Sequence, residues 1–152
     1  MKNAKQLLEE FTAFSFRDPH TAAEMFTEDG AFEMPYLESV GFPGRYQGHE
    51  QIRGFFAFVR ELYPDMEFHD TKIVCEQTDG RVVVAEYKFT ARSSKTGRMI
   101  HHLFMGRLEA ENGKIKLLRE SINLVEVGRA IYQNGLAEFK VADDAANGGD
   151  SR

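Results

Sequence analysis

Apolar residues recur at helical spacing in three segments of the first half of the chain. A first amphipathic helix is expected over about residues 4–16, with apolar positions at Ala4, Leu7, Leu8, Phe11 and Phe14. A second is expected over about 19–27, because Asp18-Pro19 is typical of a helix start. A third begins at 48–50 and ends at Tyr63-Pro64, with apolar positions at Ile52, Phe55, Phe56, Val59 and Leu62.

Between the second and third helices the pattern predicts a short strand and then an aromatic loop. Asp29-Gly30 predicts the end of the second helix, and the strand is expected over Ala31 to Tyr36. On this strand Phe32, Met34 and Tyr36 would share one face. The loop from Leu37 to Gln47 is open to two interpretations. It is either a lid over a binding site or a connector whose aromatic residues fill the edge of the core.

After about residue 66 the pattern changes to the period of two that is typical of strands. Four long strands are predicted over 66–77, 81–92, 99–110 and about 114–125, with turns at Asp79-Gly80, 93–97 and Asn112-Gly113. Such short connections predict an antiparallel meander. On its first strand we place Ile73 and Cys75 on one face, and Phe68 and Val74 on the other. A short helix over about 127–133 and a flexible tail over 141–152 are expected to follow.

This order of elements predicts an α+β fold with a single domain over residues 1–140. A long, twisted antiparallel sheet can curve as a cone around the three helices and enclose a pocket. The strand over 81–92 has apolar residues on both faces, with Val82 and Val84 on one and Val83, Ala85 and Tyr87 on the other. An apolar outer face is expected to be covered, and a symmetric homodimer would cover it most economically.

The composition narrows the range of functions. The chain has 152 residues and a formal net charge of −5 without a basic stripe, which argues against nucleic-acid binding. No apolar stretch is long enough to span a membrane and none follows the N-terminal Met, so we expect a cytoplasmic protein. The single Cys75 excludes an internal disulfide and a thiol metal cluster. Thirteen Phe and five Tyr favour a pocket for a small apolar or cyclic ligand.

The last predicted strand contains the strongest candidate for chemistry, Glu120. Alternation places Glu120 on the same face as Leu118, Ile122 and Leu124. A carboxylate among aliphatic neighbours costs free energy unless it is paired or protonated. Either Glu120 pairs with a cation on the next strand and is structural, or it lies at the floor of an apolar pocket and exchanges protons with a ligand.

A second polar group for this site is less well determined by the sequence. His101, His102, His69 and Tyr36 are the candidates, and alternation allows only one of the adjacent pair His101 and His102 to face a cavity. An imidazole beside a carboxylate makes a workable acid/base pair, although a histidine on a strand is also compatible with a purely structural role. The same alternation argues against a metal site built from His101, His102 and Glu120.

Several short motifs resemble those of the nuclear transport factor 2-like superfamily, which includes ketosteroid isomerase and the SnoaL-like polyketide cyclases. They are Phe-Thr-Glu-Asp-Gly-Ala at 26–31, the helix start Gly48-His49-Glu50 and the final strand. Two more, Tyr63-Pro64-Asp65-Met66 and the stretch 111–116 with Arg119-Glu120 and Asn123, resemble the phenazine-biosynthesis A/B proteins. The resemblance covers about residues 1–135 and implies a cone-shaped sheet around a pocket.

The resemblance also implies roles for individual residues. In the phenazine A/B proteins the Glu of the last-strand Arg-Glu motif is an acid/base in condensing an amino-keto cyclohexene carboxylate, and it matches Glu120. The family's histidine on the third helix matches Phe55 here, so that polar partner is missing. This difference separates the chain from the family's specific phenazine chemistry.

We therefore carry two hypotheses forward. The first is an acid/base enzyme without cofactor or metal, of isomerase, cyclase or dehydratase type, acting on a small cyclic or polyketide-like carbonyl compound. The second is a module of the same fold that binds a ligand or dimerises without turnover. For the enzyme, the candidate catalytic residues are Glu120, His102 and Tyr36. The candidate ligand-binding residues are Phe14, Phe55, Phe58, Val59, Phe104, Leu118 and Ile122.

Overall fold

The computed structural model describes residues 1–14 and 17–138 of the chain. The helices are α1 (Ala4–Phe14), α2 (Pro19–Glu24), α3 (Gly48–Leu62) and α4 (Leu124–Ile131), with a 3₁₀ helix η1 (Pro35–Val40). The strands are β1 (Phe26–Glu33), β2 (Arg45–Gln47), β3 (Glu67–Glu76), β4 (Val82–Arg92), β5 (Met99–Glu111) and β6 (Lys114–Ser121). The tail predicted over 141–152 lies outside the described residues.

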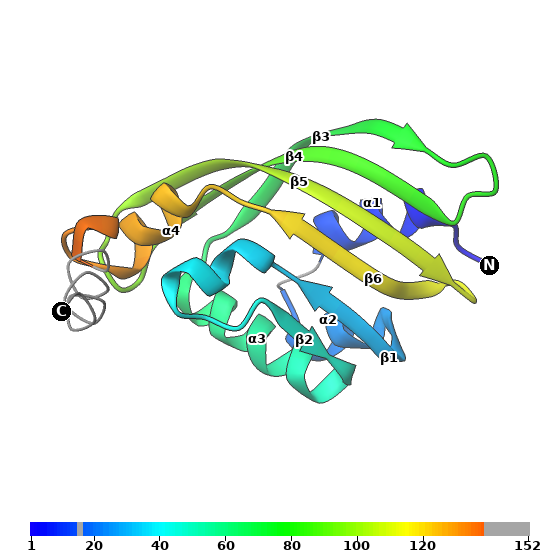
Figure 1. The fold of residues 1–152 in the computed structure, drawn as a ribbon, viewed down its shortest axis with the longest axis horizontal. Helices are drawn as coiled ribbons and strands as arrows, with labels where there is room; N and C mark the ends of the chain where they lie inside the picture. The colour runs from blue at the N-terminus through cyan, green and yellow to red at the C-terminus, as the bar shows by residue number, and fades with distance from the viewer. Residues whose placement is uncertain (15–16, 139–152) are drawn as a thin grey trace, which may run out of the picture.

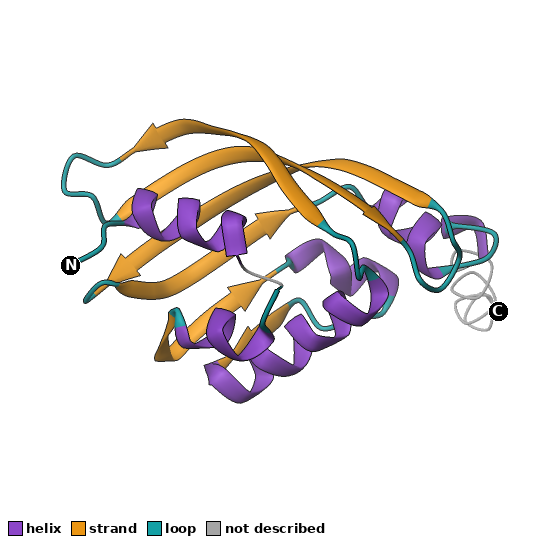
Figure 2. Cartoon of the chain, turned by 180° about the vertical axis from the view of Figure 1, so that it is seen from behind, coloured by secondary structure: helices purple, strands orange, loops and turns teal. Residues whose placement is uncertain are grey.

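All six strands form one curved sheet in the order β2-β1-β6-β5-β4-β3 (Figure 1). The four long strands are an antiparallel meander, as the alternation predicts. Helices α1, α2 and α3 lie on the concave side of this sheet, and α4 lies at the end opposite the N-terminus (Figure 2). The predicted α+β architecture is therefore confirmed, and the interior between helices and sheet is where a site can form.

Local signals place the turn before β6 and the start of α2 correctly, although α2 ends at Glu24, earlier than the expected end near residue 27. Asn112 and Gly113 both have positive φ, 52° and 74°, which matches the turn that Asn-Gly favours between two strands. The Asp18 side chain accepts hydrogen bonds from the backbone N–H groups of His20 and Thr21, and so caps α2 with Pro19 in its first turn. These features depend only on neighbouring residues, which is why the sequence predicts them.

The first strand differs from the prediction. It begins at Phe26, and Asp29-Gly30 lies inside it at an irregularity in its parallel pairing with β6. A Cβ atom at Gly30 would lie only 2.9 Å from the Ile115 carbonyl oxygen, so glycine here serves close strand packing. The strand ends at Glu33, and Pro35 starts η1. Tyr36 is consequently not on a strand face with Phe32 and its side chain is 54% exposed.

Strand β3 also departs from simple alternation. Its pairing with β4 shifts register twice, and Asp70 between His69 and Lys72 has a φ of 53°. Each bulge reverses the alternation that follows it. Phe68 and Ile73, predicted on opposite faces, therefore both pack against the core, while Cys75 is exposed.

The core centres on four Phe rings contributed by three different elements. Phe11 of α1, Phe26 and Phe32 of β1, and Phe56 of α3 are fully buried. Their ring centroids lie 5.1–6.5 Å apart. Edge and tilted contacts at these distances stabilise the packing beyond simple area burial. This cluster fixes α1 and α3 on the sheet and thereby sets the width of the interior.

The outer face of the sheet carries exposed apolar residues on β5. Leu103 is 53% and Met105 38% exposed, and the strand partners of these residues include Lys88 and Glu86. The homodimer expected to cover this face stays a prediction.

Replacing Leu103 with Glu tests that prediction. Wild-type protein is expected to have twice the chain mass by light scattering at micromolar concentration, and Leu103→Glu the mass of one chain, because a buried unpaired charge opposes association. Glu50→Lys on the exposed surface of α3 is the matched control and should leave the mass unchanged. A monomeric wild-type protein would contradict the dimer.

Candidate active site

Glu120 lies on the concave face of β6 and is completely buried. It follows Leu118, also fully buried, by two residues, so both point inward as alternation predicts. Asn123 ends this stretch by capping α4, with its side-chain oxygen accepting the Val125 N–H at 3.0 Å. The strand and the capped helix together hold Glu120 at a fixed position under the helices.

The partner of Glu120 is Tyr87 of β4, a residue that the sequence places on one strand face with Val83 and Ala85 without indicating a role. The Tyr87 hydroxyl donates a short hydrogen bond to Glu120 Oε1. Tyr87 is also fully buried. A buried tyrosine hydroxyl needs a partner, and this requirement was the signal that could have identified the pair. The sequence also allowed a cation on the next strand as the partner of Glu120, and the structure has the neutral Tyr87 in that role.

The second carboxyl oxygen of Glu120 is what makes this pair a candidate for chemistry. Within the described part of the chain, Oε2 is buried and has no hydrogen-bond partner. Burial raises the pKa of Glu120 from 4.5 to about 8, and the hydrogen bond from Tyr87 opposes this only in part. At pH 7 the carboxyl is therefore mostly protonated. Since Oε1 accepts from Tyr87, the proton resides on Oε2.

Of the two adjacent histidines, His102 faces the interior and His101 faces outward. His102 is 8% exposed, and its ring packs 4.6 Å from Phe104 and 5.1 Å from Phe89. Burial lowers the pKa of His102 to about 4, so the imidazole is neutral at pH 7. Its Nδ1 has no hydrogen-bond partner among the described residues. The backbone N–H of His101 instead donates to Glu126, at 2.9 Å.

His102 and Glu120 do not form a direct acid/base pair. Gly106 of β5 is in register with Glu120, and His102 precedes Gly106 by four residues on the same face. Four strand residues span about 13 Å. The ring of Phe104 lies between them, 4.6 Å from the His102 ring and 5.7 Å from the Tyr87 ring. The two unpartnered polar groups thus lie at opposite ends of one apolar interior.

A small apolar cavity of about 60 Å³ adjoins His102 between η1, α3, α4 and the sheet. This volume equals about two water molecules in the liquid, so a ring compound must enlarge the cavity to enter. Glu120 itself lies behind the wall rather than on it. Ile122, two residues beyond Glu120, belongs to the lining, as does Met34. The lining residues are Met34, Leu37, Phe42, Phe55, Phe58, Val59, Leu62, Tyr63, His102, Ile122, Val127 and Ile131.

The expected ligand-binding residues divide into two groups. Phe55, Phe58, Val59 and Ile122 line the cavity, whereas Phe104 and Leu118 are buried but do not line it. Phe14 does not belong to this site. It is 59% exposed at the end of α1 and lines surface hollows with Arg17.

Tyr36 does not belong to the site either, because η1 carries it to the surface away from the cavity lining. Phe55, at the position of the family's histidine, stacks on Tyr46 with ring centroids 4.2 Å apart. The third helix therefore offers an aromatic surface at this position, without a titratable group.

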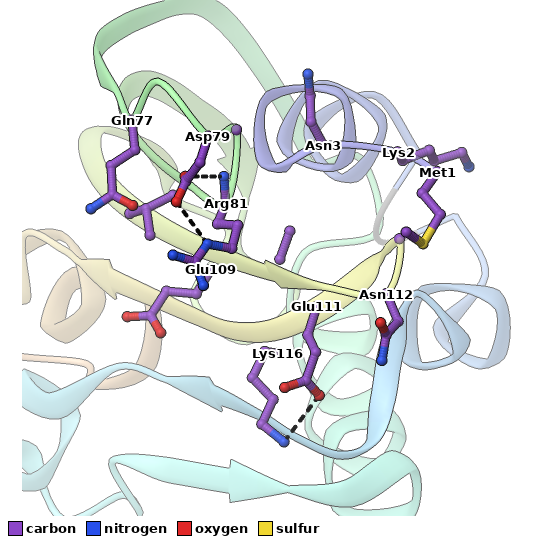
Figure 3. Close-up of a pocket in the computed structure, with 14 residues that line it drawn as sticks. Met1, Lys2, Asn3, Gln77, Asp79, Arg81, Glu109, Glu111, Asn112 and Lys116 are labelled. Carbon is purple, nitrogen blue, oxygen red and sulfur yellow. Dashed lines mark hydrogen bonds and ion pairs between the residues drawn. The ribbon is translucent and has the colours of Figure 1, made fainter.

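A larger hollow of about 660 Å³ lies at the opposite end of the molecule, between the N-terminus and two of the three turns of the meander, those near Gly80 and Gly113 (Figure 3). Its charged side chains are exposed and many are paired. Arg81 contacts Asp79 at 2.7 Å, and Lys116 contacts Asp29 at 2.6 Å and Glu111 at 3.5 Å. None of the residues expected to carry chemistry lies there, so we assign it no reaction.

The described residues contain neither a cluster suited to a metal ion nor a helix suited to crossing a membrane. Among residues 1–14 and 17–138, no group of three or more His, Cys, Asp or Glu side chains is arranged to hold a metal ion. In the same part of the chain no helix is long and apolar enough to cross a membrane.

The comparison with protein families agrees with this architecture. A family model described as a SnoaL-like domain matches residues 7–118. The chain belongs to the SnoaL-like domain family. The match ends two residues before Glu120, so the family assignment rests on the fold-forming part of the chain and not on the candidate acid.

Known relatives and solved structures extend the comparison. The chain is 29% identical over 110 residues to phenazine biosynthesis protein PhzA1 of Pseudomonas aeruginosa, covering 70% of this chain and 67% of the relative. It resembles a phenazine biosynthesis-related protein of the same organism, with a TM-score of 0.73, 21% identity and 84% of each chain covered. A putative isomerase from Bacillus subtilis has a TM-score of 0.75 at 23% identity, covering 84% of this chain and 91% of that one.

The raised pKa of Glu120 predicts a specific dependence of stability on pH. The folded state binds the Glu120 proton more tightly than the unfolded chain, so this contribution is complete below pH 4.5 and is lost as pH rises to about 8. Relative to Glu120→Gln, the wild-type free energy of unfolding should fall by roughly 5 kcal/mol at most across this range. Urea unfolding at a series of pH values measures the difference, and His102 cancels because both proteins contain it. A constant difference would contradict a buried, protonated Glu120.

Proposed function

We propose that this protein is a cofactor-independent acid/base enzyme acting on a small cyclic or polyketide-like carbonyl compound. The observation that supports the proposal best is Glu120, a buried carboxyl with one oxygen held by Tyr87 and the other without a partner in the part of the chain that the structure describes. A pKa of about 8 keeps this group close to the point where it can both give and take a proton at neutral pH.

In the proposed mechanism Glu120 moves one proton between the carbonyl oxygen and the neighbouring carbon of the ligand. The resting acid donates its Oε2 proton to the carbonyl oxygen. The resulting Glu120 carboxylate, stabilised by the Tyr87 hydroxyl, then removes a proton from the adjacent carbon. The product is the enol, and Glu120 is again protonated. An isomerase, cyclase or dehydratase can each use this step.

His102 and the aromatic wall would bind and orient the ligand. The neutral imidazole can donate or accept one hydrogen bond through Nδ1, which suits a polar substituent at the end of the ligand distant from Glu120. Phe104 lies between the two polar groups and offers its ring to the apolar body of the ligand. Enclosure by such residues excludes water and strengthens the electrostatic interactions inside.

The names of similar proteins are compatible with this class of reaction. One solved structure of the same fold is described as a putative polyketide cyclase from Xanthomonas campestris, with a TM-score of 0.70 at 18% identity. At this identity the likeness concerns the fold, so the proposed reaction rests on the geometry of Glu120 and Tyr87. The histidine of the phenazine proteins is replaced by Phe55, and we therefore propose a substrate different from theirs.

The small cavity favours one alternative, a module that binds an apolar ligand without turnover. Its volume is about 60 Å³, and its lining includes Met34 and Ile122 but not Glu120. For catalysis these side chains must move aside, and methionine is the side chain best suited to do so. For simple binding they can remain where they are.

Replacing Glu120 with Gln distinguishes the two functions. A screen of cyclic ketones and β-dicarbonyl compounds first identifies a substrate of the wild-type protein. Glu120→Gln is then expected to lower kcat by about 10²–10⁴-fold with ligand affinity retained, because it removes only the transferable proton. Glu86→Gln on the opposite face of the sheet is the matched control. Full turnover by Glu120→Gln would refute the proposal, and binding without any turnover would support the alternative.

The protonated resting form of Glu120 also determines how kcat/KM depends on pH. Because the cycle begins with proton donation from the protonated form, kcat/KM should be constant at neutral pH and fall above about pH 8. A value that rises through pH 8 would show that the carboxylate starts the reaction instead.

The aromatic residues at the cavity mouth are proposed to control entry. Phe58 is 42% exposed and its ring centroid lies 6.0 Å from that of Phe42, in the segment interpreted as either a lid or a connector. Both residues also line an apolar surface hollow outside the cavity. If the segment is a lid, Phe58→Ala should accelerate association of a fluorescent apolar probe, as measured by stopped flow. Phe14→Ala, which also removes an exposed ring, is the control. Equal rates in all three proteins would favour the connector.

A further inference from the structure

The hydrogen bond between Tyr87 and Glu120 crosses a strand that neither residue belongs to. Tyr87 is on β4 and Glu120 on β6, and β5 lies between them in the sheet. In β5 the residue in register with Glu120 is Gly106. Neighbouring strands are about 4.8 Å apart, so the two side chains meet above the β5 backbone.

A side chain at position 106 would point directly into this contact. On β5 the inward positions are buried, and they include Phe104 and Leu108 on either side of Gly106. A Cβ atom at Gly106 would lie 2.3 Å from the Tyr87 hydroxyl oxygen and 2.9–3.0 Å from two of its ring carbons. Real Cβ atoms essentially never approach another atom so closely. Tyr87 can thus reach Glu120 only because residue 106 has no side chain.

The backbone conformation does not explain this glycine. Six glycines of the described chain have positive φ, a conformation that other residues rarely adopt, and Gly106 is not among them. A glycine inside a strand also weakens the strand, because it packs no side chain and loses more conformational freedom on folding. Its position is therefore explained by the space it leaves for Tyr87.

We propose that Gly106 is a positioning residue of the acid/base site, which sets the Tyr87 hydroxyl on one oxygen of Glu120 and so leaves the other oxygen for the substrate. This inference rests on the proposed function of Glu120 for its catalytic meaning, but the positioning itself can be tested without a substrate. A larger residue at 106 would displace the phenol, and Glu120 would lose the one hydrogen bond that favours its ionised form.

A glycine in a long strand has one competing explanation, which is the shape of the strand itself. Glycines occur at bends where a sheet curves, and β5 has a register irregularity near Ala110. In that case the effect of Gly106→Ala would not depend on residue 87. If Gly106 instead serves Tyr87, the effect of Gly106→Ala must depend on whether the phenol hydroxyl is present.

The test measures the Glu120 carboxyl titration by carbon-detected NMR in a double-variant cycle. Gly106→Ala and Tyr87→Phe are each expected to raise the Glu120 pKa by about one pH unit, which is the contribution of a hydrogen bond to a charged group. The double variant should show no further shift, because both changes remove the same hydrogen bond. Additive shifts, or an unchanged pKa in Gly106→Ala, would overturn the proposal.

The clash with Tyr87 can prevent Gly106→Ala from folding in the wild-type protein, so the same change is also made in a Tyr87→Val protein. Valine removes the ring that the new methyl group would meet, so Gly106→Ala/Tyr87→Val is expected to fold as well as Tyr87→Val alone. If alanine at 106 prevents folding in both backgrounds, the strand itself requires glycine and the positioning role is wrong.

The two proposals fail in different ways. A pKa shift in Gly106→Ala together with full turnover by Glu120→Gln would refute the catalytic role of Glu120 but leave the positioning of Tyr87 by Gly106 intact. With a substrate in hand, Gly106→Ala should move the midpoint of the kcat/KM pH profile upward by the same amount as the NMR titration. A merely structural role would lower the amount of folded protein and leave that midpoint in place.

Discussion

The site depends on the free-energy cost of burying one carboxyl group, that of Glu120, beside a neutral hydrogen-bond partner. Glu120 is completely enclosed, its hydrogen-bond partner is a tyrosine, and no cation among the described residues compensates its charge. An ionised carboxylate in such surroundings is expensive, so the fold favours the protonated acid at neutral pH. The same desolvation that lowers stability at high pH gives the group a pKa at which it can exchange protons. Stability and chemistry are thus linked through one side chain.

The surrounding structure can be understood as the support for this arrangement. The cluster of Phe rings holds α1 and α3 against the sheet. Gly106 opens the path by which Tyr87 crosses β5. His102 supplies a second neutral polar group at the far end of an otherwise apolar interior. Gly106 contributes space, and His102 and the Phe rings contribute uncharged surroundings. This is consistent with a site that acts on a neutral carbonyl compound.

Features that depend on neighbouring residues could be predicted from the sequence, and features that depend on distant pairing could not. The turn at Asn112-Gly113 and the start of α2 were predicted correctly because their signals are local. The inward direction of Glu120 followed from alternation along β6. The start of β1 at Phe26 was missed because Asp29-Gly30 resembles a helix stop, while its true role depends on parallel pairing with β6, far along the chain. Tyr36 was misplaced for a different reason, because the strand ends at Glu33 and Pro35 begins a 3₁₀ helix, earlier than alternation suggested.

The role of Tyr87 is the feature of the site that the sequence could least predict. Its inward direction was predictable, but its partner lies two strands away and is reached only over Gly106. A sequence pattern gives the face of a strand and not the register between strands, and the pairing of Tyr87 with Glu120 is a matter of register. The choice of His102 over His101 likewise required the structure to show which face is concave.

The titration of the Glu120 carboxyl in the wild-type protein tests this account most directly. Carbon-detected NMR, with Glu120→Gln to assign the signal, should give a pKa near 8. A pKa at or below the ordinary value of 4.5 would mean a solvated or ion-paired carboxylate, and the buried acid on which the proposed function depends would not exist.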